Sequence, residues 1–118
     1  MDLRTGIDIV DFNKFAKNLE NNAFLRKVFT LAEIEECEQS VGAVVCFARK
    51  FAIKEAAMKA IGRGIRDEVW FLQIEILGDE ISFHAKAQGV YSDLGEPDIS
   101  VSVSIDGNLV VATVILQK

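Results

Sequence analysis

The stretch that decides the fold spans residues 51–65 and reads Phe-Ala-Ile-Lys-Glu-Ala-Ala-Met-Lys-Ala-Ile-Gly-Arg-Gly-Ile. It is rich in strong helix formers and has no glycine or proline before position 62. Extended toward the N-terminus, the apolar spacing predicts one long helix from about Ala43 to Ile61. Gly62 and Gly64 then predict its end, because glycine readily adopts the left-handed conformation that closes a helix.

Shorter elements are predicted on both sides of this helix. Upstream, residues 6–10 predict a strand, residues 12–19 a helix capped by Asp11 or Asn13, and residues 31–39 a helix. Thr30 and Glu33 form the capping-box signature of the last helix, and residues 24–29 are a short mixed segment. Downstream, we expect a short helix at 88–94 and strands at 69–77, 81–87, 100–104 and 109–116, the last two joined by the Asp106-Gly107 turn.

The order of helices first and strands afterwards predicts an α+β fold, with an antiparallel sheet packed against one long helix and shorter helices. A chain of 118 residues is expected to form a single domain over residues 1–118. No apolar run approaches the ~18 residues that span a bilayer, and residues 1–5 lack the apolar core of a signal peptide. We therefore expect a cytoplasmic protein that makes no use of a membrane.

The net charge and the cysteine content argue against two kinds of binding site. The net charge of −5 argues against general nucleic-acid binding, which needs a basic surface. Cys37 and Cys46 stand nine residues apart, and the chain has one histidine, so a zinc site is not expected. Both cysteines are expected to be reduced and partly buried.

Three features are candidates for chemistry, and each has a plainer alternative. Asp8 interrupts an apolar strand, where it either binds a metal or caps the next helix. Glu55 and Lys59 share one face of the helix, where they are either site residues or an ordinary exposed ion pair. The Gly62-Arg63-Gly64 turn either holds phosphate oxygens or only closes the helix. Together they fit one chemistry, since Mg²⁺ binds one or two carboxylates and completes its shell with water and substrate phosphates.

The order of these motifs resembles the holo-acyl-carrier-protein synthases over nearly the whole chain. Residues 6–11 (Gly-Ile-Asp-Ile-Val-Asp) look like the opening motif of this phosphopantetheinyl transferase family. Residues 29–33 (Phe-Thr-Leu-Ala-Glu) look like its FTxxE segment, and residues 51–65 resemble its FAxKEAxxKAxGxGI signature. Ile74-Glu75-Ile76 follows at the expected distance.

The resemblance implies an activity: transfer of 4′-phosphopantetheine from coenzyme A to a serine of an apo acyl carrier protein, with release of adenosine 3′,5′-bisphosphate. It implies that Asp8 and Glu55 bind Mg²⁺ and that Lys59 stabilises charge at the reacting phosphate and is a candidate proton acceptor. It further implies a homotrimer with active sites between subunits. Two sets of contacts are also implied: nucleotide phosphates at Lys50, Lys59, Gly62, Arg63 and Gly64, and the carrier protein at Lys14, Arg26 and Lys27.

Two departures from the family pattern keep other readings open. Ser102-Val103-Ser104 is followed by Ile105, where the family carries a histidine, and the single histidine, His84, is expected on a strand surface. The chain is also acidic, whereas many relatives are basic. The alternatives are a non-catalytic trimeric relative and a magnesium-dependent enzyme that uses another nucleotide donor.

Overall fold

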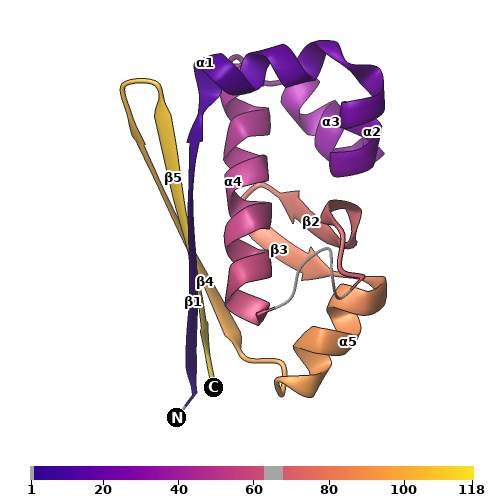
Figure 1. Cartoon of the computed structure of the whole chain (residues 1–118), viewed down its shortest axis with the longest axis vertical. Coiled ribbons are helices and arrows are strands. Elements are labelled where there is room, and N and C mark those ends of the chain that lie inside the picture. Colours follow the sequence, from indigo (N-terminus) through magenta and orange to yellow (C-terminus); the bar gives the residue numbers. More distant parts are fainter. Residues whose placement is uncertain (1, 63–67) are drawn as a thin grey trace.

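The computed structural model describes residues 2–62 and 68–118, and their elements form three layers (Figure 1). A three-stranded antiparallel sheet in the order β1-β5-β4 is one layer, and the long helix α4 is the middle one. Most of the remaining helices and the β2–β3 hairpin cover the other side of α4, and the first helix lies across its end. The elements are β1 (Leu3–Asp11), α1 (Phe12–Phe15), η1 (Ala16–Glu20), α2 (Asn22–Val28), α3 (Leu31–Glu38), α4 (Ala43–Ile61), η3 (Phe71–Gln73), β2 (Ile74–Leu77), β3 (Glu80–Phe83), α5 (Ala85–Asp93), β4 (Asp98–Asp106) and β5 (Leu109–Gln117).

Helix α4 has the bounds that its sequence predicts, and Gly62 closes it with a φ of 73°. One side of α4 packs on β1 and β5, and the other packs on α3 and β2. A helix enclosed in this way is apolar around most of its circumference. Its two buried lysines, Lys50 and Lys54, therefore need partners inside the protein.

Strand β1 lies directly against the backbone of α4. A Cβ atom built on Gly6 would be 1.8 Å from the carbonyl oxygen of Ala56, so only glycine fits there. Ala56 and Ala60 are buried at this crossing, and their small side chains let the two backbones approach. Because alternate residues of a strand share a face, Asp8 is also directed toward α4.

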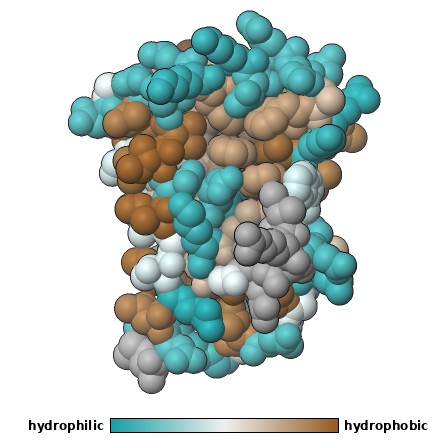
Figure 2. Space-filling view, in the orientation of Figure 1, coloured by the Kyte–Doolittle hydropathy of each residue, from teal (hydrophilic) through white to brown (hydrophobic). Residues whose placement is uncertain are grey.

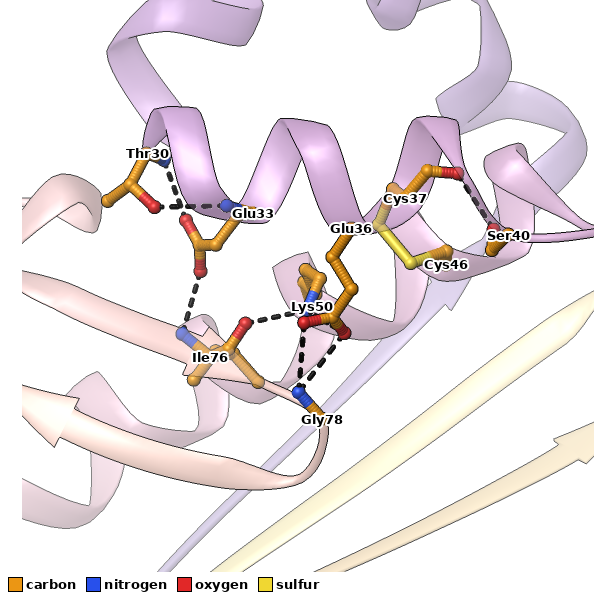
Figure 3. Close-up of a disulfide and its surroundings, with 9 residues drawn as sticks. All are labelled: Thr30, Glu33, Glu36, Cys37, Ser40, Cys46, Lys50, Ile76 and Gly78. Atoms are coloured by element: carbon orange, nitrogen blue, oxygen red, sulfur yellow. Dashed lines mark hydrogen bonds and ion pairs between the residues drawn. A yellow bond between two sulfur atoms is a disulfide. The ribbon is translucent and has the colours of Figure 1, made fainter.

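One disulfide and two ion pairs join α3 to α4. Cys37 is bonded to Cys46, Glu36 pairs with Lys50 at 2.9 Å, and Glu33 pairs with Lys54 at 2.9 Å. From link to link the residue numbers fall along α3 and rise along α4, as expected for helices packed antiparallel. Figure 3 shows the disulfide and the Glu36–Lys50 contact side by side. We refer to these three links as the α3–α4 ladder.

The Glu33–Lys54 pair is fully buried and every charged atom in it has a partner. The Lys54 ammonium donates to the carbonyl oxygens of Phe71 and Ile74 at 2.9 and 2.5 Å. The Glu33 carboxylate accepts from the backbone N–H groups of Thr30 and Ile76 at 2.8 and 2.7 Å. Burial lowers the pKa of Lys54, and the nearby Glu33 carboxylate opposes that shift. The pair thus joins α3, α4 and the start of the β2–β3 hairpin.

The structure confirms the capping box at Thr30 and the closing hairpin, and it corrects three other expectations. Residues 22–28 form the helix α2, capped by the Asn21 side chain, rather than a mixed segment. The strand expected over 69–77 begins only at Ile74, because a turn of 3₁₀ helix precedes it. The carbonyl oxygens of Phe71, in this turn, and of Ile74, directly after it, accept from Lys54. Strand β3 ends at Phe83, and α5 begins at Ala85, where the Gln73 side chain accepts from the N–H of Ala87.

The expectation of reduced cysteines is wrong in this structure. Cys37 lies at the end of α3 and Cys46 in the first turn of α4. The helix–turn–helix path places their Cα atoms 5.4 Å apart, within the range of a disulfide. Sequence spacing did not indicate the pairing, because it depends on how the intervening turn folds.

The Gly6 contact can be tested by adding one methyl group. We expect Gly6→Ala to lower the stability by about 3 kcal/mol, because the Cβ atom meets a backbone oxygen that cannot move alone. Gly89→Ala is the matched control, since Gly89 lies within α5 with open space around it and alanine favours a helix by about 1 kcal/mol. Thermal unfolding monitored by circular dichroism gives both values. Equal midpoints for Gly6→Ala and the wild type would refute the close contact.

The buried pair can be tested by a double-mutant cycle. We expect Lys54→Met to cost about 3–5 kcal/mol, because it leaves the Glu33 carboxylate buried without its cation. Adding Glu33→Gln should recover about 1–2 kcal/mol in that background, although the same change destabilises the wild type. Urea unfolding gives the free energy of unfolding of the wild type, of each single variant and of the double variant. Additive effects would mean that the two charges do not interact.

Candidate active site

A groove of about 380 Å³ opens between β1, the first helical segments and α4. Its walls come from parts of the chain that are far apart in sequence. The lining residues are Asp8, Ile9, Val10, Asp11, Lys14, Phe15, Asn18, Phe51 and Glu55. The structure therefore brings together Asp8 and Glu55, the two carboxylates that the sequence analysis selected as metal ligands, and adds the predicted docking residue Lys14.

Lys59 is bound to the strand that carries Asp8. Its ammonium lies 3.1 Å from the Asp8 carboxylate and donates to the carbonyl oxygen of Ile7 at 2.9 Å. The Lys59 side chain is about half exposed, at 52%, whereas that of Asp8 is 18% exposed. Lys59 thus holds the Asp8 side chain in place and still reaches solvent at the edge of the site.

The charged form of Glu55 is disfavoured by its surroundings in the groove. Burial raises its pKa, the nearby negative charge of Asp8 raises it further, and Lys59 opposes both effects. Two carboxylates that repel each other in a partly buried groove are stabilised when a cation binds between them. This electrostatic arrangement fits a divalent metal ion.

The chemistry of the donor set narrows the kind of ion. Within residues 2–62 and 68–118, no group of three or more histidine, cysteine, aspartate or glutamate side chains could enclose a metal. Zinc sites usually have such an enclosing set, whereas Mg²⁺ is held by one or two carboxylates with water and phosphate oxygens. Asp8 and Glu55 therefore fit magnesium in the presence of a phosphate-bearing substrate.

Lys50 lies apart from this groove. Its ammonium is buried, donates to the carbonyl oxygen of Ile76 at 2.6 Å and pairs with Glu36. It lines a second groove of about 440 Å³ at the α3–α4 junction, together with Arg49, which pairs with Asp79. Contact between Lys50 and a nucleotide phosphate stays a prediction, and the structure gives Lys50 a role in holding α3 to α4.

The glycine turn is described only in part. Gly62 is exposed and left-handed, directly after the helical turn that carries Lys59. Arg63 and Gly64 lie outside the described residues. Ile105, at the position of the family's histidine, pairs with Val110 on β5 and is 49% exposed. His84 is exposed after β3, beside Ser82.

Of the three predicted docking cations, Lys14 lines the first groove, and Arg26 and Lys27 lie on the following helix. Lys14 is on α1, and Arg26 and Lys27 are in the last turn of α2, all three exposed. Lys17, which the sequence analysis did not select, is exposed on η1, and α2 packs against η1. Figure 2 shows hydrophilic side chains gathered over this end of the molecule.

Two further residues have positions in the fold that their neighbours in sequence do not indicate. Lys54 stands beside Glu55 in the sequence, but one helical step directs it to the opposite side of α4. Asp11, noted only as a helix cap, caps α1 through the N–H groups of Asn13 and Lys14 and also lines the groove. A hydrogen bond from the Asn108 side chain is the main cause that lowers the pKa of Asp11. No helix within the described ranges is long and apolar enough to cross a membrane.

Comparison with known proteins matches the sequence motifs and the fold. The family model of the 4′-phosphopantetheinyl transferase superfamily matches residues 4–114. A holo-[acyl-carrier-protein] synthase of Koribacter versatilis is 42% identical over 125 residues, covering 99% of each chain. The crystal structure of the corresponding synthase of Neisseria meningitidis superposes with a TM-score of 0.80, at 31% identity and with 98% of each chain covered.

A structure with a bound ligand is also similar. The holo-(acyl-carrier-protein) synthase of Bacillus anthracis, solved in complex with CoA (3′,5′-ADP), has a TM-score of 0.78 and 30% identity, with 98% of this chain and 96% of that chain covered. These matches confirm the α+β fold expected from the motifs. The chain therefore belongs to the 4′-phosphopantetheinyl transferase superfamily, among the holo-acyl-carrier-protein synthases.

Proposed function

We propose that this chain transfers 4′-phosphopantetheine from coenzyme A to a serine of an apo acyl carrier protein. The observation that carries the proposal is the meeting of Asp8 and Glu55 in one groove, with Lys59 bound to Asp8. The match to holo-acyl-carrier-protein synthases over almost the whole chain supports the same activity. Mg²⁺ held by Asp8 and Glu55 would neutralise the pyrophosphate of coenzyme A and orient it.

The protein takes little direct part in the bonds that form and break in this reaction. The carrier's serine oxygen attacks the β-phosphorus of the pyrophosphate, and the bond to the bridging oxygen breaks, which releases adenosine 3′,5′-bisphosphate. Positioning and charge stabilisation supply most of the catalysis in such transfers. In this scheme Lys59 stabilises the charge on the transferred phosphate and is a candidate acceptor for the serine proton, while Gly62, Arg63 and Gly64 contact the nucleotide.

The local charge around α1 and α2 supports carrier binding even though the whole chain is acidic. Residues 12–28 carry four cations and a single carboxylate, Glu20. The cations in this segment are Lys14, Lys17, Arg26 and Lys27. An acidic carrier would be attracted to this end of the molecule and directed to the groove that Lys14 lines.

The outer face of the sheet supports assembly into a homotrimer. Ile7 and Ile9 on β1 are 56% and 60% exposed, and Leu109 on β5 is 39% exposed on the same face. Figure 2 shows hydrophobic side chains along the side of the molecule where the sheet lies. Large apolar side chains exposed close together are often covered by a partner. We also place the protein in the cytoplasm, as a single domain over residues 1–118.

Mass spectrometry of an apo carrier protein tests the activity. With coenzyme A and Mg²⁺ we expect the carrier to gain one phosphopantetheine, and chelation of the metal should stop the reaction. Asp8→Asn and Glu55→Gln should lower the rate at least ~100-fold by removing a metal ligand. Glu38→Gln, at an exposed position of α3, should not change the rate. Lys59→Ala should lower kcat more than it weakens coenzyme A binding.

Other outcomes of that assay would reject the proposal. Binding of coenzyme A without transfer to any of several carriers would favour the non-catalytic alternative. Transfer only from a different nucleotide donor would favour the altered-donor alternative. Full activity of Asp8→Asn or of Glu55→Gln would overturn the assignment of the metal ligands.

The assembly is tested by light scattering with size-exclusion chromatography. The wild type should elute with three times the 13.0 kDa mass of one chain. Ile7→Glu should give monomers, because it places a charge on the exposed apolar face of the sheet. Leu31→Glu is the control, since Leu31 is 82% exposed on α3 and should leave the trimer intact. A wild-type monomer, or dissociation by both variants, would contradict the trimer.

A further inference from the structure

The disulfide lies where the two helices of the ladder meet the second groove. Cys37 is fully buried, whereas Cys46 is half-buried and lines the groove of about 440 Å³. A small thiol or disulfide in solution can therefore reach the Cys46 sulfur first. Cys37 is placed to complete the exchange from inside the protein.

The surroundings of Cys46 favour exchange chemistry. It occupies the first turn of α4, where the helix N-terminus carries partial positive charge, and Arg49 and Lys50 line the same groove. The helix N-terminus stabilises a thiolate at Cys46, the form that attacks a disulfide. Glu36 and Asp79 also line the groove, and their charges are paired with Lys50 and Arg49.

The disulfide is directly adjacent to the Glu36–Lys50 pair of the ladder. Glu36 precedes Cys37 in sequence, and Lys50 follows Cys46 by one helical turn. Glu36 also accepts from the N–H of Gly78, as Glu33 accepts from that of Ile76, so the same two glutamates hold β2 and the turn that follows it (Figure 3). Opening the disulfide removes the only covalent link among these contacts within the described residues.

We propose that Cys37 and Cys46 form a redox switch that sets how firmly α3 holds α4 and β2. In the closing step the Cys46 thiolate attacks a low-molecular-weight disulfide such as glutathione disulfide and forms a mixed disulfide. The Cys37 thiol then displaces the second glutathione, so two protein thiols are oxidised and one glutathione disulfide is reduced to two glutathiones. Excess reduced glutathione reverses both steps. This inference does not depend on the proposed activity.

The experiment equilibrates the full chain in mixtures of reduced and oxidised glutathione and counts free thiols by alkylation and mass spectrometry. We expect no free thiols in excess glutathione disulfide and two in excess reduced glutathione. Closing a short loop should raise the thermal unfolding midpoint by about 10 °C. Amide hydrogen exchange at Ile76 and Gly78, which report on the ladder, should be about tenfold slower in the oxidised protein.

The double variant Cys37→Ala/Cys46→Ala is the control, and its midpoint and exchange rates should not respond to the glutathione mixture. Three results would overturn the switch. Both thiols could stay free in glutathione disulfide, or the bond could stay closed in excess reduced glutathione. Finally, the two redox states could show the same unfolding midpoint and the same exchange at Ile76 and Gly78.

Discussion

The close approach of β1 to α4 at Gly6 is the constraint on which the candidate site depends. Asp8 is two residues along the same strand, and Glu55 and Lys59 lie on either side of Ala56 in the helix sequence. A side chain at position 6 would push the strand away from the helix and separate the groups that now meet. The site is therefore a consequence of backbone packing, with its three charged residues attached to two elements that glycine and alanine allow to touch.

The opposite side of α4 is held by charge. A helix this enclosed would normally have only apolar residues inward, yet Lys50 and Lys54 are both buried. Their partners on α3 and their contacts with carbonyl oxygens of residues 71–76 compensate the desolvation of the two ammonium groups. These contacts fix the rotation of α4 about its own axis and its position along that axis. Glu55 is therefore kept on the side of Asp8, while Lys54, its neighbour in sequence, faces the other way.

Much of this could be predicted from the sequence, for identifiable reasons. Helix α4, the Thr30–Glu33 capping box and the β4–β5 hairpin depend on local signals, and each lies where those signals place it. The 3₁₀ turn before β2 and the early end of β3 depend on Lys54 and Gln73 side chains that reach across the fold, so no local pattern indicates them. The Cys37–Cys46 bond and the separation of Lys50 from the metal ligands are likewise set by tertiary packing.

Paramagnetic relaxation tests directly whether Asp8 and Glu55 form one cation site. Mn²⁺ titrated into ¹⁵N-labelled protein broadens the amide resonances nearest to the bound ion. We expect the resonances of residues around positions 8 and 55 to broaden first, and a large excess of Mg²⁺ to restore them. Broadening centred instead on Glu36 and Asp79, the carboxylates of the other groove, would contradict it.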